Sequence, residues 1–345
     1  TCALPISILR IDGNLLKTKY PSFTPRDIEE LLFPMLNNEQ RRVLEQTWEL
    51  DMSYGVSGVG RFRVNIYKNR GTYAAAFRTV ISQIPAFETL GLSDVVKNIT
   101  MRPRGLILVT GPTGSGKSTT LAAMIDYINE NRSEHILTIE DPIEFVHRSK
   151  KSVIHQRELG QDTRSFANAL KSALREDPDI ILVGEIRDME TVKNALHAAE
   201  TGHLVFSTLH TFNAIQTFHR ILGFFPPIER DAVRQQFAEV YRGSISQRLL
   251  PKADNSSRVC AVEILQTTST IKDFFIKDEL EEIYNLVQKG SYNGMITFNE
   301  SLFNLYNEGK ITQETALENS DNPNELRNLM RGAYSGSENF YKNGL

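Results

Sequence analysis

The sequence predicts an α/β protein with two folded parts: an α+β domain with an antiparallel sheet, then a larger domain with a mostly parallel sheet. Three observations point to this class. The chain has 345 residues, which is more than one average domain needs. Residues 60–67 alternate between apolar and polar side chains, as in a strand with one buried face. Beyond residue 104, fully apolar runs alternate with helical segments, which is typical of a parallel sheet covered on both faces.

The composition is that of a soluble globular protein and disfavours several function classes. Hydrophobic residues make up 40% of the chain and charged residues 23%, which excludes a largely disordered or fibrous protein. The net charge of −3 provides no basic excess for binding nucleic acid or anionic lipid. Cys2 and Cys260 are too few for a disulfide framework or a four-thiolate zinc site, which favours a reducing compartment.

The sequence contains no targeting or membrane-spanning signal. No apolar run approaches the ~18–20 residues that span a bilayer. The first residues, TCALPISIL, have no basic region before the apolar stretch, so they do not form a signal peptide and look like a truncated start. We therefore expect a cytoplasmic protein.

The first domain is expected at residues 1–84, where short strand-like and helical runs alternate. Its predicted elements are a strand and turn at 8–14, helical structure at 25–49, and strands at 60–67 and 72–81. Pro34 lies inside the helical stretch and is expected to kink it or to end a helix there.

Residues 85–104 are predicted to link the domains, because Pro85, Gly91 and Pro103 interrupt a loosened pattern. The second domain is then expected at residues 105–272, followed by a helical region at 273–345. The predicted core elements are strands at 105–110, 135–139, 180–183 and 204–208 and a helix at 117–131.

A glycine-rich turn between the first of these strands and the helix predicts a nucleotide site. The segment Gly111-Pro112-Thr113-Gly114-Ser115-Gly116-Lys117-Ser118 matches G-x-x-x-x-G-K-[ST], and Thr119 follows it. Glycines let successive backbone N–H groups surround an anion, and the helix directs its positive end at the same anion. Lys117 is expected to reach the β- and γ-phosphates of ATP, and the Ser118 hydroxyl to bind Mg²⁺.

Acidic residues follow two of the predicted strands. Glu185 comes after the strand at 180–183, where ligands of open α/β sheets bind, so it is expected to order a water of Mg²⁺ or to act as general base. Glu140, Asp141 and Glu144 follow the strand at 135–139. Glu144 could polarise the attacking water, and Glu140 or Asp141 could hold the metal shell through water. The alternative is that these acids are solvated loop residues or helix caps.

Histidines and arginines supply further candidates. His210 follows the strand at 204–208 and could contact the γ-phosphate, whereas His203 precedes that strand and is less well placed. The alternative for both is a hydrogen-bonded structural histidine. Arg63 and Arg78 lie on the two arms of the N-terminal hairpin, where a guanidinium could meet a phosphate from outside the phosphate-loop domain. The alternative for both is a solvated strand residue.

Four segments together resemble one family. GPTGSGKSTT (111–120), TIEDPIEF (138–145), LREDPDIILVGEIRD (174–188) and ETGHLVFSTLHT (200–211) resemble the Walker A, Asp-box, Walker B and His-box motifs of the secretion ATPase superfamily of type II secretion and type IV pili. Within that superfamily the chain resembles the PilT/PilU-type retraction ATPases. The resemblance covers the chain from about residue 8 onward.

The resemblance implies a PAS-like N-terminal domain and a RecA-like ATPase core with a helical C-terminal region. It implies a homohexameric ring at the cytoplasmic base of the pilus machine, peripheral to the inner membrane, with a platform protein of that membrane as partner. ATP hydrolysis with Mg²⁺ would drive pilus retraction and hence twitching motility. The motif residues carried over are Glu185 as catalytic Walker B glutamate, Glu144 as Asp-box glutamate, His203 and His210 as His-box pair, and Arg63 and Arg78 as arginines that close on the phosphates.

Departures from the family pattern refine this expectation. The chain lacks the tetracysteine zinc element and the long extra N-terminal domain of assembly ATPases, which favours retraction. The C-terminal signature is degenerate at 270–277, and residues 294–312 resemble the PilU branch, which suggests an accessory motor beside a PilT-like ring. Two alternatives stay open. A nucleic-acid-translocating RecA-like ATPase is disfavoured by the charge balance, and a regulatory or scaffold subunit with low turnover is disfavoured by Lys117, Ser118 and Glu185.

Overall fold

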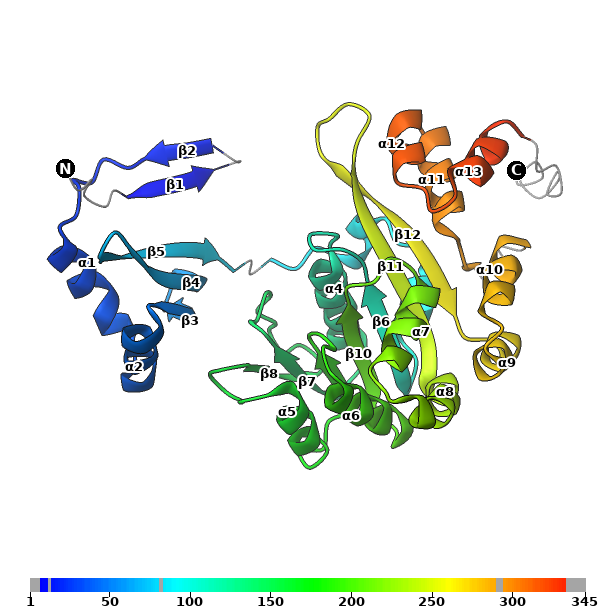
Figure 1. Ribbon diagram of the computed structural model, residues 1–345, viewed down its shortest axis with the longest axis horizontal. Coiled ribbons are helices and arrows are strands. Elements are labelled where there is room, and N and C mark those ends of the chain that lie inside the picture. The colour runs from blue at the N-terminus through cyan, green and yellow to red at the C-terminus, as the bar shows by residue number, and fades with distance from the viewer. Residues whose placement is uncertain (1–6, 12–13, 81–82, 290–293, 333–345) are drawn as a thin grey trace. The chain divides into compact units, whose positions relative to one another are not determined.

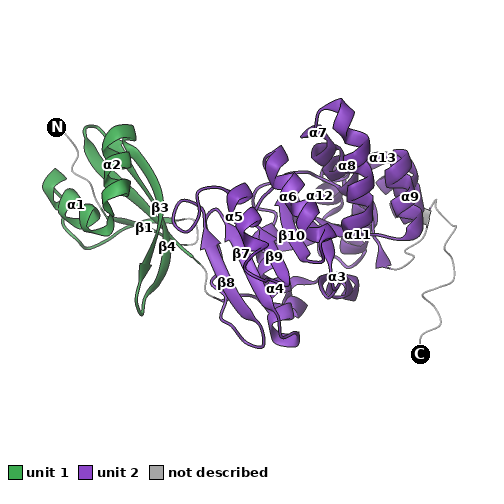
Figure 2. Ribbon diagram, turned by 90° about the horizontal axis from the view of Figure 1, so that it is seen from below, with its two compact units in different colours: residues 1–82 green, residues 83–345 purple. Residues whose placement is uncertain are grey.

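The computed structural model describes residues 7–11, 14–80, 83–289 and 294–332. The chain forms two compact units, residues 1–82 and 83–345 (Figure 1, Figure 2). The first unit contains β1 (Ile8–Ile11), β2 (Asn14–Lys17), α1 (Pro25–Leu32), the 3-10 helix η1 (Phe33–Met35), α2 (Asn38–Thr47), β3 (Glu49–Val56), β4 (Gly60–Asn69) and β5 (Thr72–Thr79).

The second unit is larger. Its strands are β6 (Gly105–Thr110), β7 (His135–Glu140), β8 (Val153–Glu158), β9 (Ile180–Val183), β10 (Leu204–Leu209), β11 (Tyr241–Pro251) and β12 (Arg258–Gln266). Its helices are η2 (Phe87–Leu90, 3-10), α3 (Asp94–Thr100), α4 (Lys117–Asn131), α5 (Phe166–Ala173), α6 (Met189–Glu200), α7 (Ala214–Gly223), α8 (Pro227–Val240), α9 (Ser269–Lys277), α10 (Leu280–Lys289), α11 (Phe298–Asn307), α12 (Gln313–Glu318) and α13 (Pro323–Met330).

The first unit is built around an antiparallel sheet of order β3-β4-β5. Thr24 and Asn37 form capping boxes that begin α1 and α2, and Pro34 lies in the 3-10 turn that ends α1, as predicted. The predicted strands at 60–67 and 72–81 are confirmed as β4 and β5, except that residue 81 lies outside the described residues. β3 was not predicted. The core of this unit comprises Leu32, Leu44, Val64, Ile66 and Tyr73.

The second unit is built around a seven-stranded sheet of order β12-β11-β6-β10-β9-β7-β8. Its pairs are parallel except for β11 with β12, so the predicted mostly parallel sheet is confirmed. β6 explains why such a strand is apolar throughout. Leu106 and Leu108 pack in a cluster with α5 to α8, and Ile107 and Val109 pack in another with α3 and α4.

The segment at 85–104, predicted as a linker, belongs to the second unit. It contains η2 and α3, and Phe87, Val96 and Ile99 are buried in the cluster that includes α4. The sequence pattern loosens there because these elements are only 4 and 7 residues long, too short to show a period.

The C-terminal region is helical in its described part, as predicted, although α9 begins at Ser269, before the predicted boundary at 273. Phe298, Leu302 and Leu305 of α11 pack with Leu250 of β11 and Ala261 of β12. None of the helices that the structure describes is long and apolar enough to cross a membrane.

Candidate nucleotide-binding site

The parallel register brings four loops to one edge of the large sheet. Thr110, the last residue of β6, pairs with Leu209, the last residue of β10. Val183, the last residue of β9, pairs with Ser207 of β10 and with Ile139 of β7. The loops that follow β6, β7, β9 and β10 therefore start side by side, which is where the sequence placed its phosphate and carboxylate motifs.

The loop after β6 has the backbone of an anion cradle. Gly111 has φ 144°, and a Cβ there would lie 2.4 Å from the carbonyl oxygen of Gln247. Only glycine fits this position. Gly116 has φ 93° and precedes α4 without a side-chain cap, so the first N–H groups of α4 are open to an anion. The Ser115 hydroxyl is buried and has no hydrogen-bond partner within the described residues. The loop thus fits a bound phosphate.

Lys117 is buried inside this loop. Its Nζ donates to the carbonyl oxygens of Gly111 at 2.8 Å and Pro112 at 3.1 Å. Burial lowers the pKa of Lys117, and the charges of Glu185 and Glu144 oppose that shift. Both carboxylates are therefore within electrostatic range of the ammonium. Ser118 and Thr119 follow in the first turn of α4 and are partly exposed.

Glu185 lies one residue beyond Gly184, whose carbonyl oxygen accepts a hydrogen bond from Thr208 Oγ1 at 2.7 Å. Glu185 Oε2 accepts from Arg187 Nε at 2.8 Å, and Glu185 Oε1 lies 3.6 Å from His210 Nε2. The ends of β9 and β10 thus converge on one carboxylate.

Arg187 is the centre of this cluster and was missed by the sequence reasoning. Its Nη1 lies 3.2 Å from Asp141 Oδ2, while its Nε holds Glu185. One guanidinium therefore joins the acids that follow β7 and β9. The signal was available: Arg187 lies two residues after Glu185, and a guanidinium can engage two carboxylates at once.

The Glu140 carboxylate is held by hydrogen bonds within the protein. Its Oε1 accepts from Thr138 Oγ1 at 2.7 Å and from Gln156 Nε2 at 3.1 Å, and its Oε2 accepts from the Glu144 N–H at 3.4 Å. Burial raises the pKa of Glu140. These bonds shape the turn that carries Asp141 and Glu144. A metal-shell role for Glu140 and Asp141 stays a prediction. The described residues contain no group of three or more His, Cys, Asp or Glu side chains that could hold a metal ion by itself.

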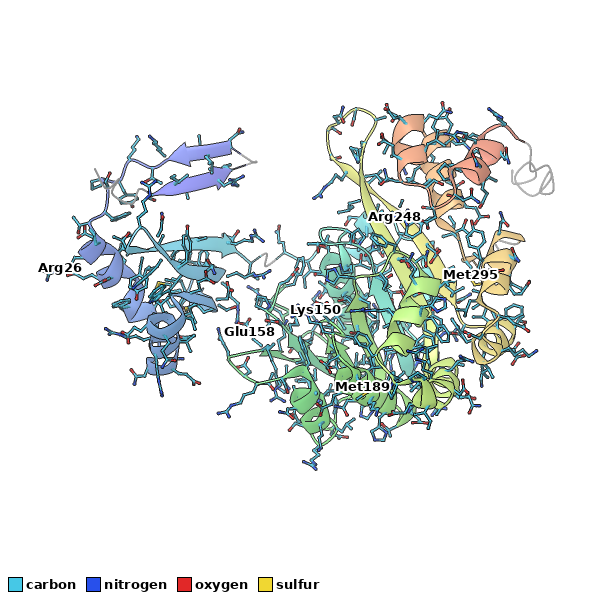
Figure 3. All side chains as sticks on the ribbon, viewed as in Figure 1. Arg26, Lys150, Glu158, Met189, Arg248 and Met295 are labelled. Atoms are coloured by element: carbon cyan, nitrogen blue, oxygen red, sulfur yellow. The ribbon has the colours of Figure 1, made fainter. Side chains whose placement is uncertain are left out.

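The loop after Glu144 is fastened to the helix of the phosphate loop. Lys150, which is labelled in Figure 3, lies in this loop. It forms ion pairs of 2.8 Å with Asp126 and with Glu130 of α4. His147 lies in the same loop, and its Nδ1 is buried without a hydrogen-bond partner in the described structure. Burial lowers the pKa of His147 to about 4, with Asp126 opposing and Lys150 adding to the shift. His147 is therefore neutral at physiological pH.

His203 lies at the opposite end of β10 from His210. It precedes Leu204, which pairs with Gly105 at the start of β6. Its Nδ1 lies 2.9 Å from the carbonyl oxygen of Ala198. Within this chain, His203 is not brought to the phosphate loop, and its assignment as a catalytic residue stays a prediction.

Arg63 and Arg78 face each other as a register pair between β4 and β5. They lie in the first unit, whereas the phosphate loop lies in the second. Neighbours in a register pair project from the same face of a sheet, so the two arginine side chains share one face. Their action on the phosphates stays a prediction.

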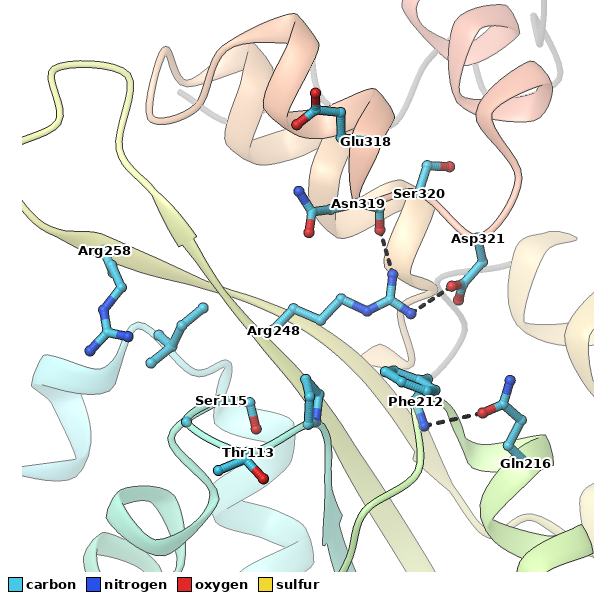
Figure 4. A pocket seen from close by; sticks show the side chains of 13 residues that line it. Thr113, Ser115, Phe212, Gln216, Arg248, Arg258, Glu318, Asn319, Ser320 and Asp321 are labelled. Carbon is cyan, nitrogen blue, oxygen red and sulfur yellow. Dashed lines mark hydrogen bonds and ion pairs between the residues drawn. The ribbon is translucent and has the colours of Figure 1, made fainter.

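A pocket of about 550 Å³ borders the phosphate loop (Figure 4). Thr113, Gly114, Phe212, Arg248 and Asp321 are among the residues that line it. Arg248 Nη1 donates to the carbonyl oxygen of Asn319, and Arg248 Nη2 lies 2.5 Å from Asp321 Oδ1. The central carbon of the guanidinium lies 4.1 Å from the centre of the Phe298 ring. The sequence located the phosphate-loop wall of this pocket but not the walls formed by Arg248, Arg258 and residues 318–321, which lie in distant segments that match no motif.

Comparisons with known proteins agree with this geometry. A model of the family described as "Type II/IV secretion system protein" matches residues 72–336. The "Type IV pilus retractation ATPase PilT" of Pseudomonas aeruginosa is 47% identical over 317 residues, which cover 92% of each chain. The "Type IV pilus ATPase PilU" of the same organism is 37% identical over 331 residues, which cover 96% of this chain and 86% of the relative.

Solved structures give the same result. The "Pilus Retraction Motor PilT and Bound ADP" superposes with a TM-score of 0.88 at 50% identity, covering 95% of this chain and 94% of the other. The ATPase DotB of Legionella pneumophila has a TM-score of 0.79 at 28% identity, with 94% and 89% covered.

Proposed function

Because the chain belongs to the type II/IV secretion system protein family, we propose that it is an ATP-hydrolysing motor that drives retraction of type IV pili and thereby twitching motility. The observation that carries the proposal is the arrangement of Lys117 and Glu185. A buried ammonium lies in a loop built for phosphate, and the carboxylate of Glu185, which follows β9 two strands away from β6, is in electrostatic range. This pair suits the binding of a triphosphate and the activation of water beside it.

In the proposed mechanism, the phosphates displace the carbonyl oxygens of Gly111 and Pro112 from the Lys117 ammonium. The Ser118 hydroxyl would hold Mg²⁺, which neutralises charge on the phosphates when bound. Glu185 orients the attacking water and accepts its proton as the bond from the γ-phosphorus to the bridging oxygen breaks. ADP and inorganic phosphate are the products.

Other residues of the edge assist this chemistry. Glu144 polarises the same water, and His210 detects whether the γ-phosphate is present, since it lies 3.6 Å from the Glu185 carboxylate. Arg63 and Arg78 close on the phosphates from an N-terminal unit, of the same chain or of a neighbouring one. Loss of phosphate then removes the anion that these arginines hold, and the units move relative to one another.

We propose further that the motor is a homohexameric ring on the cytoplasmic face of the inner membrane at the pilus base, with a membrane platform protein as partner. Family membership supports this proposal. Identity is 47% to PilT and 37% to PilU, so the comparisons do not single out the PilU branch that residues 294–312 suggested. A PilU-like accessory role beside a PilT-like ring is the alternative.

Phosphate release by the purified protein tests the proposal. The wild type should hydrolyse ATP with Mg²⁺, Lys117→Ala should reduce release to background, and Glu185→Gln should lose turnover while still binding a fluorescent ATP analogue. Lys310→Ala is the matched control, because Lys310 is an exposed lysine whose ion pair with Glu308 contributes little. Wild-type turnover equal to that of Lys117→Ala would instead support a scaffold or regulatory subunit.

A further inference from the structure

A line of hydrogen bonds crosses the sheet from the phosphate loop to the start of α7. Thr110, directly before Gly111, donates from Oγ1 to Ser246 Oγ at 3.0 Å. Ser246 donates in turn to Glu263 Oε1 at 3.4 Å. The same carboxylate oxygen accepts the N–H of Ala214, the first residue of α7, at 2.7 Å. The line therefore runs through β6, β11 and β12 and ends at a helix terminus.

The register explains why these residues meet. Thr110 pairs with Ser246 between β6 and β11, and Ser246 pairs with Glu263 between β11 and β12. Thr110 and Ser246 are fully buried, so each hydroxyl needs a partner within the protein. Each hydroxyl has one proton to donate, and both donate toward Glu263. The carboxylate is the acceptor on which the line depends.

We propose that Glu263 is a positioning residue that joins the strand before the phosphate loop to the start of α7, and so holds the His210 loop in register with the phosphate loop. His210 lies four residues before Ala214, and its ring lies 3.6 Å from Glu185. Loss of the hydrogen bond from the Ala214 N–H to Glu263 would let the loop at 210–213 move relative to Glu185 and the phosphate loop. This inference rests on the proposed ATPase function and names a residue that acts through others.

The charge of Glu263 changes near neutral pH. Burial raises the pKa of Glu263 to about 7, and Asp321 adds to the shift, whereas the bonds from Ala214 and Ser246 and the charge of Arg248 oppose it. Tyr241 of β11 and Tyr284 of α10 also interact electrostatically with this carboxylate. An ionised carboxylate accepts a stronger hydrogen bond than a neutral acid. The positioning should therefore tighten as pH rises through 7.

Glu263→Gln tests the proposal, because an amide keeps an acceptor oxygen but cannot ionise. At pH 6 the wild-type acid is mostly neutral, so kcat of the two proteins should agree. At pH 8, kcat of Glu263→Gln should be lower by about fivefold, since its bonds lack charge assistance, while KM changes by less than about twofold. A ratio of kcat values that does not change with pH would overturn the proposal.

Hydrogen exchange gives a readout that needs no activity. The amides of 211–217 should exchange faster in Glu263→Gln than in wild type at pH 8 and equally fast at pH 6. Identical exchange at both pH values would overturn the positioning role even if the protein hydrolyses ATP. Absence of hydrolysis by the wild type, with the exchange difference present, would instead contradict only the proposed function.

Two further variants serve as a control and as a second test. Glu300→Gln is the matched control: Glu300 is also partly buried, burial raises its pKa, and it accepts the Thr297 N–H at 3.0 Å, but it has no place in the line. It should behave as wild type at both pH values. If Glu263→Gln does not fold, Ser246→Ala removes the middle hydroxyl. Faster exchange at 211–217 is expected for that variant, and unchanged exchange would overturn the proposal.

Discussion

Arg187 holds Glu185 through a hydrogen bond of 2.8 Å from Nε to Oε2, and its Nη1 reaches Asp141 at 3.2 Å. The guanidinium therefore fixes the direction of the carboxylate that is proposed to activate water. The other carboxylate oxygen, which lies near His210, is left for substrate chemistry. Substitution of Arg187 therefore tests the proposed role of Glu185.

Arg187→Ala should lower kcat by about tenfold to a hundredfold, because Glu185 loses its orientation, with KM changed by less than about threefold. Arg187→Lys should be intermediate, since one ammonium cannot span both carboxylates as a planar guanidinium does. Steady-state phosphate release measures both. Arg157→Ala, which breaks a comparable ion pair with Glu176, serves as the control and should keep wild-type kcat. A wild-type kcat for Arg187→Ala would contradict the role.

Gly111→Ala should destabilise the fold by about 2–3 kcal/mol, because an added Cβ would overlap the Gln247 carbonyl oxygen in a backbone conformation that suits glycine. Gly114→Ala is the matched comparison in the same loop. Its φ is also positive, but nothing lies within 4 Å of the added Cβ, so we expect a loss of only about 1 kcal/mol. Denaturant unfolding of the two variants measures the difference, and equal losses would argue against the close approach.

Arg78→Ala should slow hydrolysis more than it weakens nucleotide binding, because the arginine is proposed to act on charge that develops in the transition state. We expect kcat to fall by at least about tenfold while the affinity for a fluorescent ATP analogue changes by less than about threefold. Arg26→Ala, an exposed arginine of the same unit, is the control. Equal losses in kcat and affinity would place Arg78 in ground-state binding instead.

His147 should make the protein sensitive to acid. Its pKa of about 4 in the folded protein lies below the ordinary 6.5, so the unfolded chain binds a proton in this range and the folded protein does not. The contribution of His147 to stability is therefore complete above pH 6.5, and about 3 kcal/mol is lost as pH falls to 4. His147→Gln should unfold with a flatter pH dependence. An equally steep pH dependence of the free energy of unfolding in His147→Gln would contradict this role.

The sequence predicted the parts of the fold where local pattern and burial coincide. β6, β9 and β10 are fully buried and mostly apolar, and the loops after them carry the motifs, so the sheet and the phosphate loop could be located in advance. β8 and β11 were missed because polar side chains occupy much of both strands. Ser246 of β11 is polar because it belongs to the line that ends at Glu263.

The same reason explains which site residues were missed. Arg187 lies in the segment 174–188 that resembles the Walker B motif, but no role was assigned to it there, and Glu263 lies in none of the four motif segments. Both act on residues brought near by sheet register. Register depends on tertiary packing, which a pattern along one segment does not contain. His203 is the opposite case. It belongs to the same motif as His210, but it lies at the far end of β10, away from the phosphate loop.

The bonds from Lys117 to two carbonyl oxygens of its own loop bear on the speed of the cycle. A buried ammonium without a hydrogen-bond acceptor costs free energy. If product release left Lys117 in that state, the cost would slow the release of the product. Here the Lys117 ammonium can return to the carbonyl oxygens of Gly111 and Pro112 when the phosphate leaves. The ammonium therefore keeps hydrogen-bond acceptors when the phosphate leaves, which suits a protein that must release spent nucleotide and bind fresh nucleotide in every cycle.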